Sequence, residues 1–299
     1  MTTSPDNNIH IPLYVQRTVG EKINAAIDFL RQNWRVLLRF SIYLLLPLAL
    51  IHSVGLFTFV KSVTADHYNS TDMGFFTSAI FFVISMCLIY TFILTMFQYY
   101  QGSTDGNLSM LTFSDVRGQM WYNFKRMLVI MIPLVVIMAL IAVMMFVFIF
   151  IPFISMPFVV GLAILSFILM MVPIHYVLEN TTIALAFSRS FSHARGSWGK
   201  LFGLMFALLL VVGIIGSATS LPMLVVIFAT KNLTPSGGLS MTLQLTIDVI
   251  LYIYIILETF FGYLLTALVI TTLIYHYGSN AREHDDLAIA SDIENFANL

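Results

Sequence analysis

The feature that most limits the fold of this chain is a series of six long apolar stretches. They cover residues 36–60, 75–99, 127–150, 158–178, 201–229 and 243–275. A helix needs about 20 apolar residues to cross the hydrocarbon core of a bilayer, and backbone groups in lipid must be hydrogen-bonded within the segment. Only 10% of the residues are charged, against about 25% in soluble domains. The sequence therefore predicts an all-α integral membrane protein with six transmembrane helices, and not a soluble enzyme.

The third and fourth stretches are joined by the segment IPFISMP, which runs from Ile151 to Pro157. Two prolines in so short a segment favour the end of one helix and the start of the next. The alternative is a single kinked helix, which would place about fifty apolar residues in one crossing that needs only about 20. We therefore expect a transmembrane hairpin.

The basic residues gather in alternate connections between the stretches. Those on one side are Arg17, Lys22, Arg31, Arg35, Arg39, Arg117, Lys125, Arg126, Arg189, Arg195, Lys200 and Arg282, and those on the other are Lys61 and Lys231. The positive-inside rule then places both termini in the cytoplasm. The polar start MTTSPDNNIH lacks the pattern of a cleaved signal peptide. The predicted organisation is a polar tail over 1–17, a membrane domain over 18–277 and a cytoplasmic tail over 278–299.

Three of the predicted cytoplasmic segments carry apolar residues at helical spacing. The apolar positions are Val19, Ile23, Ala26, Ile27, Leu30 and Trp34; Phe113, Val116, Met120 and Phe124; and Ile183, Phe187, Phe191 and Ala194. Thr18 and Glu21 fit a capping box at the start of the first. Such helices either lie among lipid headgroups or cap the span ends, and we favour the cap. The candidate interfacial basic residues are Arg17, Lys22, Arg31, Arg117, Lys125, Arg189 and Arg195.

This order of amphipathic helix, basic junction and hairpin occurs three times. RFSIYLLLP and KRMLVIMIP each place a basic residue eight positions before a proline, and the hairpins end in FQYY, PIHY and IYHY. The pattern suggests three parallel repeats about an axis along the membrane normal, unlike the inverted repeats of many transporters. Aromatic belts that arose independently would give similar hairpin ends.

The segment PIHYVLENTTIALAFSRSFSHARGSWGKLFGL, residues 173–204, resembles the membrane domain attached to some bacterial glycerophosphodiester phosphodiesterases and related multi-pass inner-membrane proteins. The shared positions are Pro173, Glu179, Ala184, Ser188, Arg195, Gly196 and Trp198. The tail YHYGSNAREHDD is similar to those of Bacteroidetes members of this group. In the phosphodiesterases, catalysis belongs to a separate soluble barrel, for which the residues after Tyr277 leave no room. The resemblance therefore implies a non-catalytic protein of the bacterial inner membrane.

Few residues in the stretches suit chemistry. No phosphate loop or zinc-type histidine pair is present, so no cofactor, metal or nucleic-acid partner is predicted. Glu258 is the deepest charge, and we expect it to point into the bundle toward His52 or Tyr254. Asp248 is expected near the headgroups. Glu258 serves either as a structural hydrogen-bonding group or as a site for a lipid, an ion or a proton.

Three functions follow from these observations. The first is a non-catalytic module of the envelope that interacts with membrane lipids, alone, as a homo-oligomer or with a membrane protein partner. The second is a transporter or permease whose pathway includes Glu258. The third, a membrane-embedded lipid enzyme, is least favoured because no nucleophile–base or metal set stands out. The spans carry few polar residues for an aqueous path, so the first function is favoured.

Overall fold

The computed structural model describes residues 10–64, 73–103, 106–149, 155–195, 197–232 and 241–297. In these residues the chain forms eight α-helices and no strand. Six of the helices are long and apolar enough to cross a membrane, namely α2 (Trp34–Thr64), α3 (Met73–Gly102), α4 (Phe113–Ile149), α5 (Ser155–Leu178), α7 (Trp198–Asn232) and α8 (Met241–Ala297). The predicted class, an all-α multi-pass membrane protein, is confirmed.

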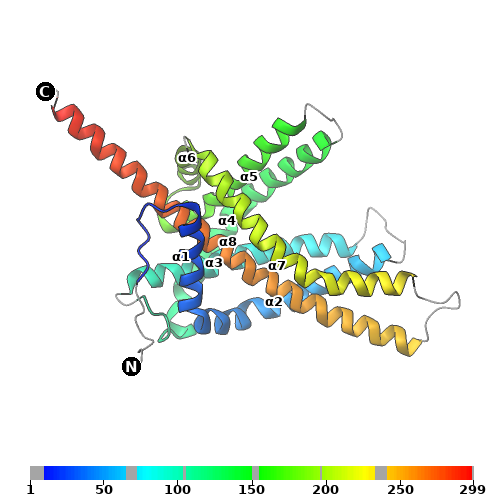
Figure 1. Ribbon diagram of the computed structural model, residues 1–299. Helices are drawn as coiled ribbons and strands as arrows, with labels where there is room; N and C mark the ends of the chain where they lie inside the picture. Colours follow the sequence, from blue (N-terminus) through cyan, green and yellow to red (C-terminus); the bar gives the residue numbers. More distant parts are fainter. Residues whose placement is uncertain are drawn as a thin grey trace, which may run out of the picture. The chain divides into compact units, whose positions relative to one another are not determined.

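The join between the third and fourth spans separates two helices. Residues 150–154 lie outside the described residues, but α4 ends at Ile149 and α5 begins at Ser155. The two helices pack side by side, as the green pair in Figure 1 shows. The predicted hairpin is therefore confirmed.

The three amphipathic segments differ in how they connect to the spans. The first is α1 (Val19–Gln32) and the third is α6 (Ile183–Ala194), both short separate helices. The second is continuous with the third span and forms the amino-terminal part of α4, because no helix-breaking residue separates it from the apolar stretch. An amphipathic segment followed by a helical hairpin therefore occurs three times along the chain, with the middle amphipathic segment fused to its span. A common rotation axis stays a prediction.

The capping box at the start of α1 is confirmed. The Thr18 hydroxyl accepts from the Glu21 N–H at 3.4 Å, and the Glu21 carboxylate accepts from the Thr18 N–H at 2.7 Å. Hydrogen bonds from the backbone and side chain of Thr18 lower the pKa of Glu21. These local bonds define where α1 begins.

The structure divides into two compact units, each made of several chain segments. Unit 1 contains residues 1–37, 90–208 and 268–299, and unit 2 contains residues 38–89 and 209–267. The core of unit 1 is aromatic, because Phe29 of α1 packs on Phe97 and Tyr100, and Phe97 packs on Tyr275.

The described residues next to the two predicted tail boundaries contact each other and the helices of unit 1. The Ile11 N–H donates to the Tyr100 hydroxyl at 2.7 Å, and the Arg17 N–H donates to Ser279 Oγ at 3.1 Å. A Cβ on Gly278 would stand 2.5 Å from the backbone oxygen of Leu13, so only glycine permits this approach. Residues on both sides of the boundaries predicted at 17/18 and 277/278 therefore take part in the packing of unit 1.

Candidate functional site

The intramembrane carboxylate Glu258 belongs to unit 2, where its partner is Ser220 of α7. The Ser220 hydroxyl donates to Glu258 Oε1 at 2.6 Å. The prediction that His52 would be the partner is wrong. Positions 258 and 263 are roughly 140° apart around a helix, and it is Tyr263 that faces His52.

Both ring nitrogens of His52 are engaged within unit 2. Nδ1 lies 2.8 Å from the Tyr263 hydroxyl, and Nε2 lies 3.3 Å from Ser78 Oγ of α3. The Tyr263 hydroxyl is also 2.6 Å from Ser85 Oγ. Among the described residues, no hydrogen bond joins Tyr254 to Glu258, although the two are near enough to interact electrostatically. The three residues predicted as one polar site therefore do not form one.

The second intramembrane carboxylate, Asp248, forms an ion pair. Lys61 Nζ of α2 lies 2.7 Å and 2.9 Å from the two carboxylate oxygens of Asp248. The pair neutralises both charges at that end of the spans, so Asp248 has a protein partner in addition to any headgroup it reaches.

The Glu258–Ser220 pair leads to a prediction about stability. Glu258→Gln keeps a carbonyl acceptor for Ser220. The melting temperature of this variant in detergent should therefore stay near that of the wild type. Glu258→Leu should lower the free energy of unfolding by at most about 1–2 kcal/mol, because measured intramembrane hydrogen bonds are modest. Ser220→Ala should cause a similar loss that is not additive with Glu258→Leu.

Additive losses in the Ser220/Glu258 double variant would contradict a structural role for this pair. If Glu258 instead holds an ion, a proton or a lipid, Glu258→Gln should abolish transport or ligand retention while the melting temperature stays unchanged. The glutamine variant thus separates the two roles of Glu258 considered from the sequence.

Unit 1 contains a group of polar side chains that we call the basic cluster. Its members come from the segment before α1, from α1, from the end of α5, from α6 and from the last part of α8: Arg17, Lys22, His175, Glu179, Arg189, His193, His276 and Asn280. Only Glu179 among them carries a negative charge.

Glu179 stands at the centre of one half of the basic cluster. His175 Nδ1 lies 2.8 Å from one carboxylate oxygen, and the Arg189 guanidinium donates to the other. Burial raises the pKa of Glu179, but the hydrogen bonds and positive charges of His175 and Arg189 outweigh it and lower the pKa to about 2. His175 is fully buried, and its ring packs on His193 and Tyr277.

The other half of the basic cluster is a buried chain of polar contacts. Lys22, only 3% exposed, places its Nζ 3.1 Å from His276 Nδ1. His276 Nε2 is 3.2 Å from Asn280 Nδ2, which also reaches Ser197 Oγ. Since an ammonium has only donors, Nδ1 of His276 accepts from Lys22. The proton of the neutral imidazole then lies on Nε2, so Nε2 and the Asn280 amide nitrogen are in contact as two donors and do not form a hydrogen bond. This chain links α1 to α8 and α7.

Arg126 forms hydrogen bonds at the end of α5. It was not predicted as a site residue. Its guanidinium donates to the backbone oxygens of Tyr176 at 2.6 Å and Thr181 at 2.9 Å, and to the Asn180 side chain. It also stacks 4.2 Å from the Tyr176 ring centroid. Asn180 has φ +50°, which asparagine tolerates where a helix ends. Arg126 therefore satisfies one carbonyl in the last turn of α5 and one in the segment that follows it.

The seven predicted interfacial basic residues fall into two sets. Arg17, Lys22 and Arg189 make the contacts described above, and Arg17 also lies over the Tyr275 ring at 5.2 Å. The others are exposed: Arg31, Arg117, Lys125 and Arg195. The buried face of α1 is Lys22, Ala25, Ala26 and Phe29, and Ile27 remains exposed. Helix α1 therefore packs one face on unit 1 and leaves Ile27 exposed.

All three tryptophans of the chain lie exposed in unit 1 near the start of a span. Trp34 begins α2, Trp198 begins α7, and Trp121 lies near the start of α4, with exposed fractions of 53%, 54% and 58%. Two of them carry a cation over the ring, with Arg35 at 5.7 Å from Trp34 and Lys125 at 5.2 Å from Trp121. Exposed tryptophans of this kind, which together we call the tryptophan belt, are typical of the level where lipid meets water.

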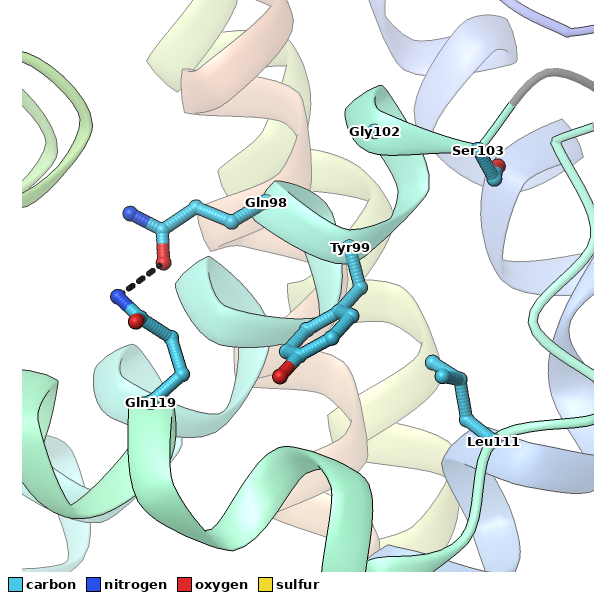
Figure 2. Close-up of a pocket in the computed structure, with 6 residues that line it drawn as sticks. All are labelled: Gln98, Tyr99, Gly102, Ser103, Leu111 and Gln119. Atoms are coloured by element: carbon cyan, nitrogen blue, oxygen red, sulfur yellow. Dashed lines mark hydrogen bonds between the residues drawn. The ribbon is translucent and has the colours of Figure 1, made fainter.

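An open cleft of about 450 Å³ lies between the end of α3 and the start of α4. Figure 2 shows its six lining residues, which are Gln98, Tyr99, Gly102, Ser103, Leu111 and Gln119. None of these side chains is charged. The amides of Gln98 and Gln119 face each other across the two helices and are hydrogen-bonded at 3.3 Å.

Sequence reasoning missed the cleft and the histidines of the basic cluster. His175 and His276 sit in the PIHY and IYHY hairpin ends, which were interpreted as signs of an internal repeat, with independent aromatic belts as the alternative. A recurring histidine within an aromatic motif was the available signal. Within the described residues, no three or more His, Cys, Asp or Glu side chains are grouped so as to hold a metal ion.

No family model, no curated protein and no solved structure matches this chain.

Proposed function

We propose that this protein is a non-catalytic membrane module whose basic end binds anionic lipid headgroups. The observation that carries the proposal is the belt of exposed tryptophans, Trp34, Trp121 and Trp198, near the starts of three spans. Tryptophan concentrates at the membrane interface, where its ring meets both lipid tails and polar headgroups. The belt therefore marks the level at which neighbouring side chains meet headgroups.

Exposed cations accompany this belt in unit 1. Arg31, Arg117, Lys125 and Arg195 are all exposed, and among them Lys125 lies over Trp121. Anionic lipid attracts such charges with about 1 kcal/mol for each residue near the surface. A module that needs only this surface is supported by the described residues without any catalytic group.

The proposal includes the compartment and the orientation. We place the protein in the inner membrane of a bacterium with both termini in the cytoplasm, on the strength of the charge bias of the connections. The likeness to the membrane domains attached to glycerophosphodiester phosphodiesterases points to the same compartment. Glu179 and Trp198, two positions of that likeness, lie in unit 1 together with the basic cluster.

A permease remains the alternative function, and the position of Glu258 favours it. This carboxylate is half-buried in the membrane-spanning part of α8 and is hydrogen-bonded only to a single serine among the described residues. An intramembrane ionisable residue commonly marks an ion or substrate pathway. The Glu258→Gln variant described above tests this alternative.

Lipid retention tests the proposed function. The purified protein is reconstituted in nanodiscs of phosphatidylcholine doped with phosphatidic acid, extracted in mild detergent and examined by native mass spectrometry. Neutralising Arg31, Arg117, Lys125 and Arg195 to glutamine should weaken retention of phosphatidic acid by roughly fivefold for each charge. Added salt should reduce wild-type retention as well, because these charges are exposed.

The matched control keeps every charge by exchanging lysine and arginine at the same four positions, and it should retain phosphatidic acid as the wild type does. Equal retention by the neutralised and the charge-retaining variants would refute the proposal. So would a wild-type protein that shows no preference for phosphatidic acid over phosphatidylcholine.

A further inference from the structure

The cleft between α3 and α4 has a lining that suits an uncharged polar ligand. Its polar groups are two amides, a phenol and a hydroxyl, contributed by Gln98, Gln119, Tyr99 and Ser103. Its volume of about 450 Å³ falls in the range of about 300–1,000 Å³ that small-molecule sites occupy. A charged ligand would find no counter-charge among the six lining residues.

The two amides are held in place before any ligand arrives. Gln98 Oε1 accepts from Asn123 Nδ2 at 2.8 Å and from Gln119 Nε2 at 3.3 Å. Asn123 is buried and also donates to Thr95 Oγ1 at 2.9 Å. The lining amides therefore have fixed orientations, which reduces the entropy lost on binding.

This arrangement leaves an acceptor available at the cleft. Gln119 Nε2 donates to Gln98 Oε1 and to Asn123 Oδ1, so both of its N–H groups are used. No hydrogen bond from the described residues reaches Gln119 Oε1, which is free to accept. Gln98 Nε2 donates to the Val177 oxygen of α5. A hydroxyl can donate, so it matches the acceptor that Gln119 offers.

Gly102 keeps the cleft open. A Cβ built on this residue meets no atom within 4 Å, so the missing side chain leaves space that belongs to the cleft. Larger side chains at position 102 would therefore fill the cleft without displacing the helices around it.

The level of the cleft along α4 indicates which ligands can reach it. Gln119 precedes the exposed Trp121 by two residues on α4, which is about 3 Å along a helix axis. Tryptophans of this kind lie at headgroup level. The cleft therefore opens where the headgroups of membrane lipids are concentrated.

We infer that the cleft binds the uncharged, hydroxyl-bearing part of a lipid headgroup, either a sugar or a glycerol. The inference rests on the proposed lipid-binding function for the source of the ligand. It adds a discrete site that selects hydroxyl groups and acts separately from the exposed cations, which attract charge.

The test compares the wild type with Gly102→Leu, which fills the cleft, and with Gly118→Leu as the matched control. Gly118 lies on α4 beside Gln119, does not line the cleft, and likewise has open space at its Cβ. Nanodiscs of phosphatidylcholine contain equal amounts of a glucosyl diacylglycerol, phosphatidylglycerol and phosphatidic acid. Native mass spectrometry then gives the retention of each lipid relative to phosphatidylcholine.

The wild type and Gly118→Leu should retain at least one of the two hydroxyl-bearing lipids. In Gly102→Leu, the retention of that lipid should be about tenfold lower. Loss of the glucosyl lipid in Gly102→Leu identifies a sugar as the ligand, and loss of phosphatidylglycerol alone identifies a glycerol. Retention of phosphatidylglycerol by itself does not, because the exposed cations also attract this anionic lipid. If Gly102→Leu fails to fold by thermal melting, Ser103→Leu fills the same cleft and should show the same loss.

Equal retention by the filled and the wild-type cleft would overturn the inference, as would a wild type that enriches neither hydroxyl-bearing lipid. Phosphatidic acid distinguishes this failure from that of the proposed function, because it has no headgroup hydroxyl and binds through the exposed cations. Retained phosphatidic acid, with no effect of Gly102→Leu on either hydroxyl-bearing lipid, would refute the cleft alone. Loss of all three lipids would refute both.

Discussion

Glu179→Leu is expected to lower the free energy of unfolding by roughly 3 kcal/mol, since it removes the carboxylate that pairs with both His175 and Arg189. His175 is fully buried, and its Nε2 has no hydrogen-bond partner among the described residues. Without Glu179, both ring nitrogens would be left unsatisfied in the interior. Arg189 is partly exposed and can turn to water, which keeps the loss below that of a fully buried pair.

Thermal melting in detergent measures this loss, and two variants act as controls. Glu179→Gln keeps an acceptor for Arg189 and should lose about half as much stability. Glu21→Gln removes an exposed carboxylate of the same unit while keeping a side chain that completes the capping box, and it should melt near the wild type. If Glu179→Leu melted at the same temperature as Glu21→Gln, the ion pair of Glu179 would not stabilise unit 1.

The low pKa of Glu179 adds a dependence on pH to the same prediction. Its folded pKa of about 2 lies below the ordinary value of 4.5, so the folded state favours the charged carboxylate. The stabilisation is therefore complete above pH 4.5 and is lost as the pH falls through 2. Wild-type melting temperatures should fall over this interval more steeply than those of Glu179→Gln.

Gly55→Ala is expected to destabilise unit 2 by roughly 2 kcal/mol, because two helices approach each other through their backbones at this point. A Cβ on Gly55 of α2 would stand 2.8 Å from the backbone nitrogen and 3.1 Å from the Cα of Ser78 on α3. Backbone atoms cannot rotate away, so α2 and α3 must separate. The contact between His52 Nε2 and Ser78 Oγ, one turn away at 3.3 Å, should weaken at the same time.

Gly213→Ala is the matched control for this substitution. Gly213 lies within α7 of the same unit, and a Cβ there meets no atom within 4 Å. Alanine should therefore be tolerated at position 213, with a gain of up to about 1 kcal/mol from helix propensity. Equal melting temperatures for Gly55→Ala and Gly213→Ala would contradict the close approach of α2 and α3.

The two proposed lipid contacts differ in what they require of the protein. The exposed cations need only to lie at headgroup level, so lysine and arginine are interchangeable there. The cleft needs the amides of Gln98 and Gln119 in fixed orientations and an open position at Gly102. A lipid that carries both a charge and a hydroxyl-bearing headgroup would engage both features of unit 1.

The sequence by itself determined the membrane class, the six spans, the hairpin between α4 and α5, and the start of α1. Each of these depends on the local chain: apolar length is a property of one segment, and the capping box joins Thr18 to a residue three positions away. The order of amphipathic segment and hairpin, which occurs three times, follows for the same reason. No partner segment has to be known for any of them.

Only the tertiary structure decided which polar side chains meet. Successive residues turn about 100° around a helix, so depth along a span does not say which neighbour a side chain faces. Glu258 faces Ser220 and Tyr263 faces His52, although both tyrosine and glutamate lie on α8. Lys22 was predicted on the basic surface of α1 and is buried instead, because the helix turns that side toward His276. The rotation of each helix about its own axis is set by packing against segments far apart in the chain. The sequence pattern of a single helix therefore does not determine it.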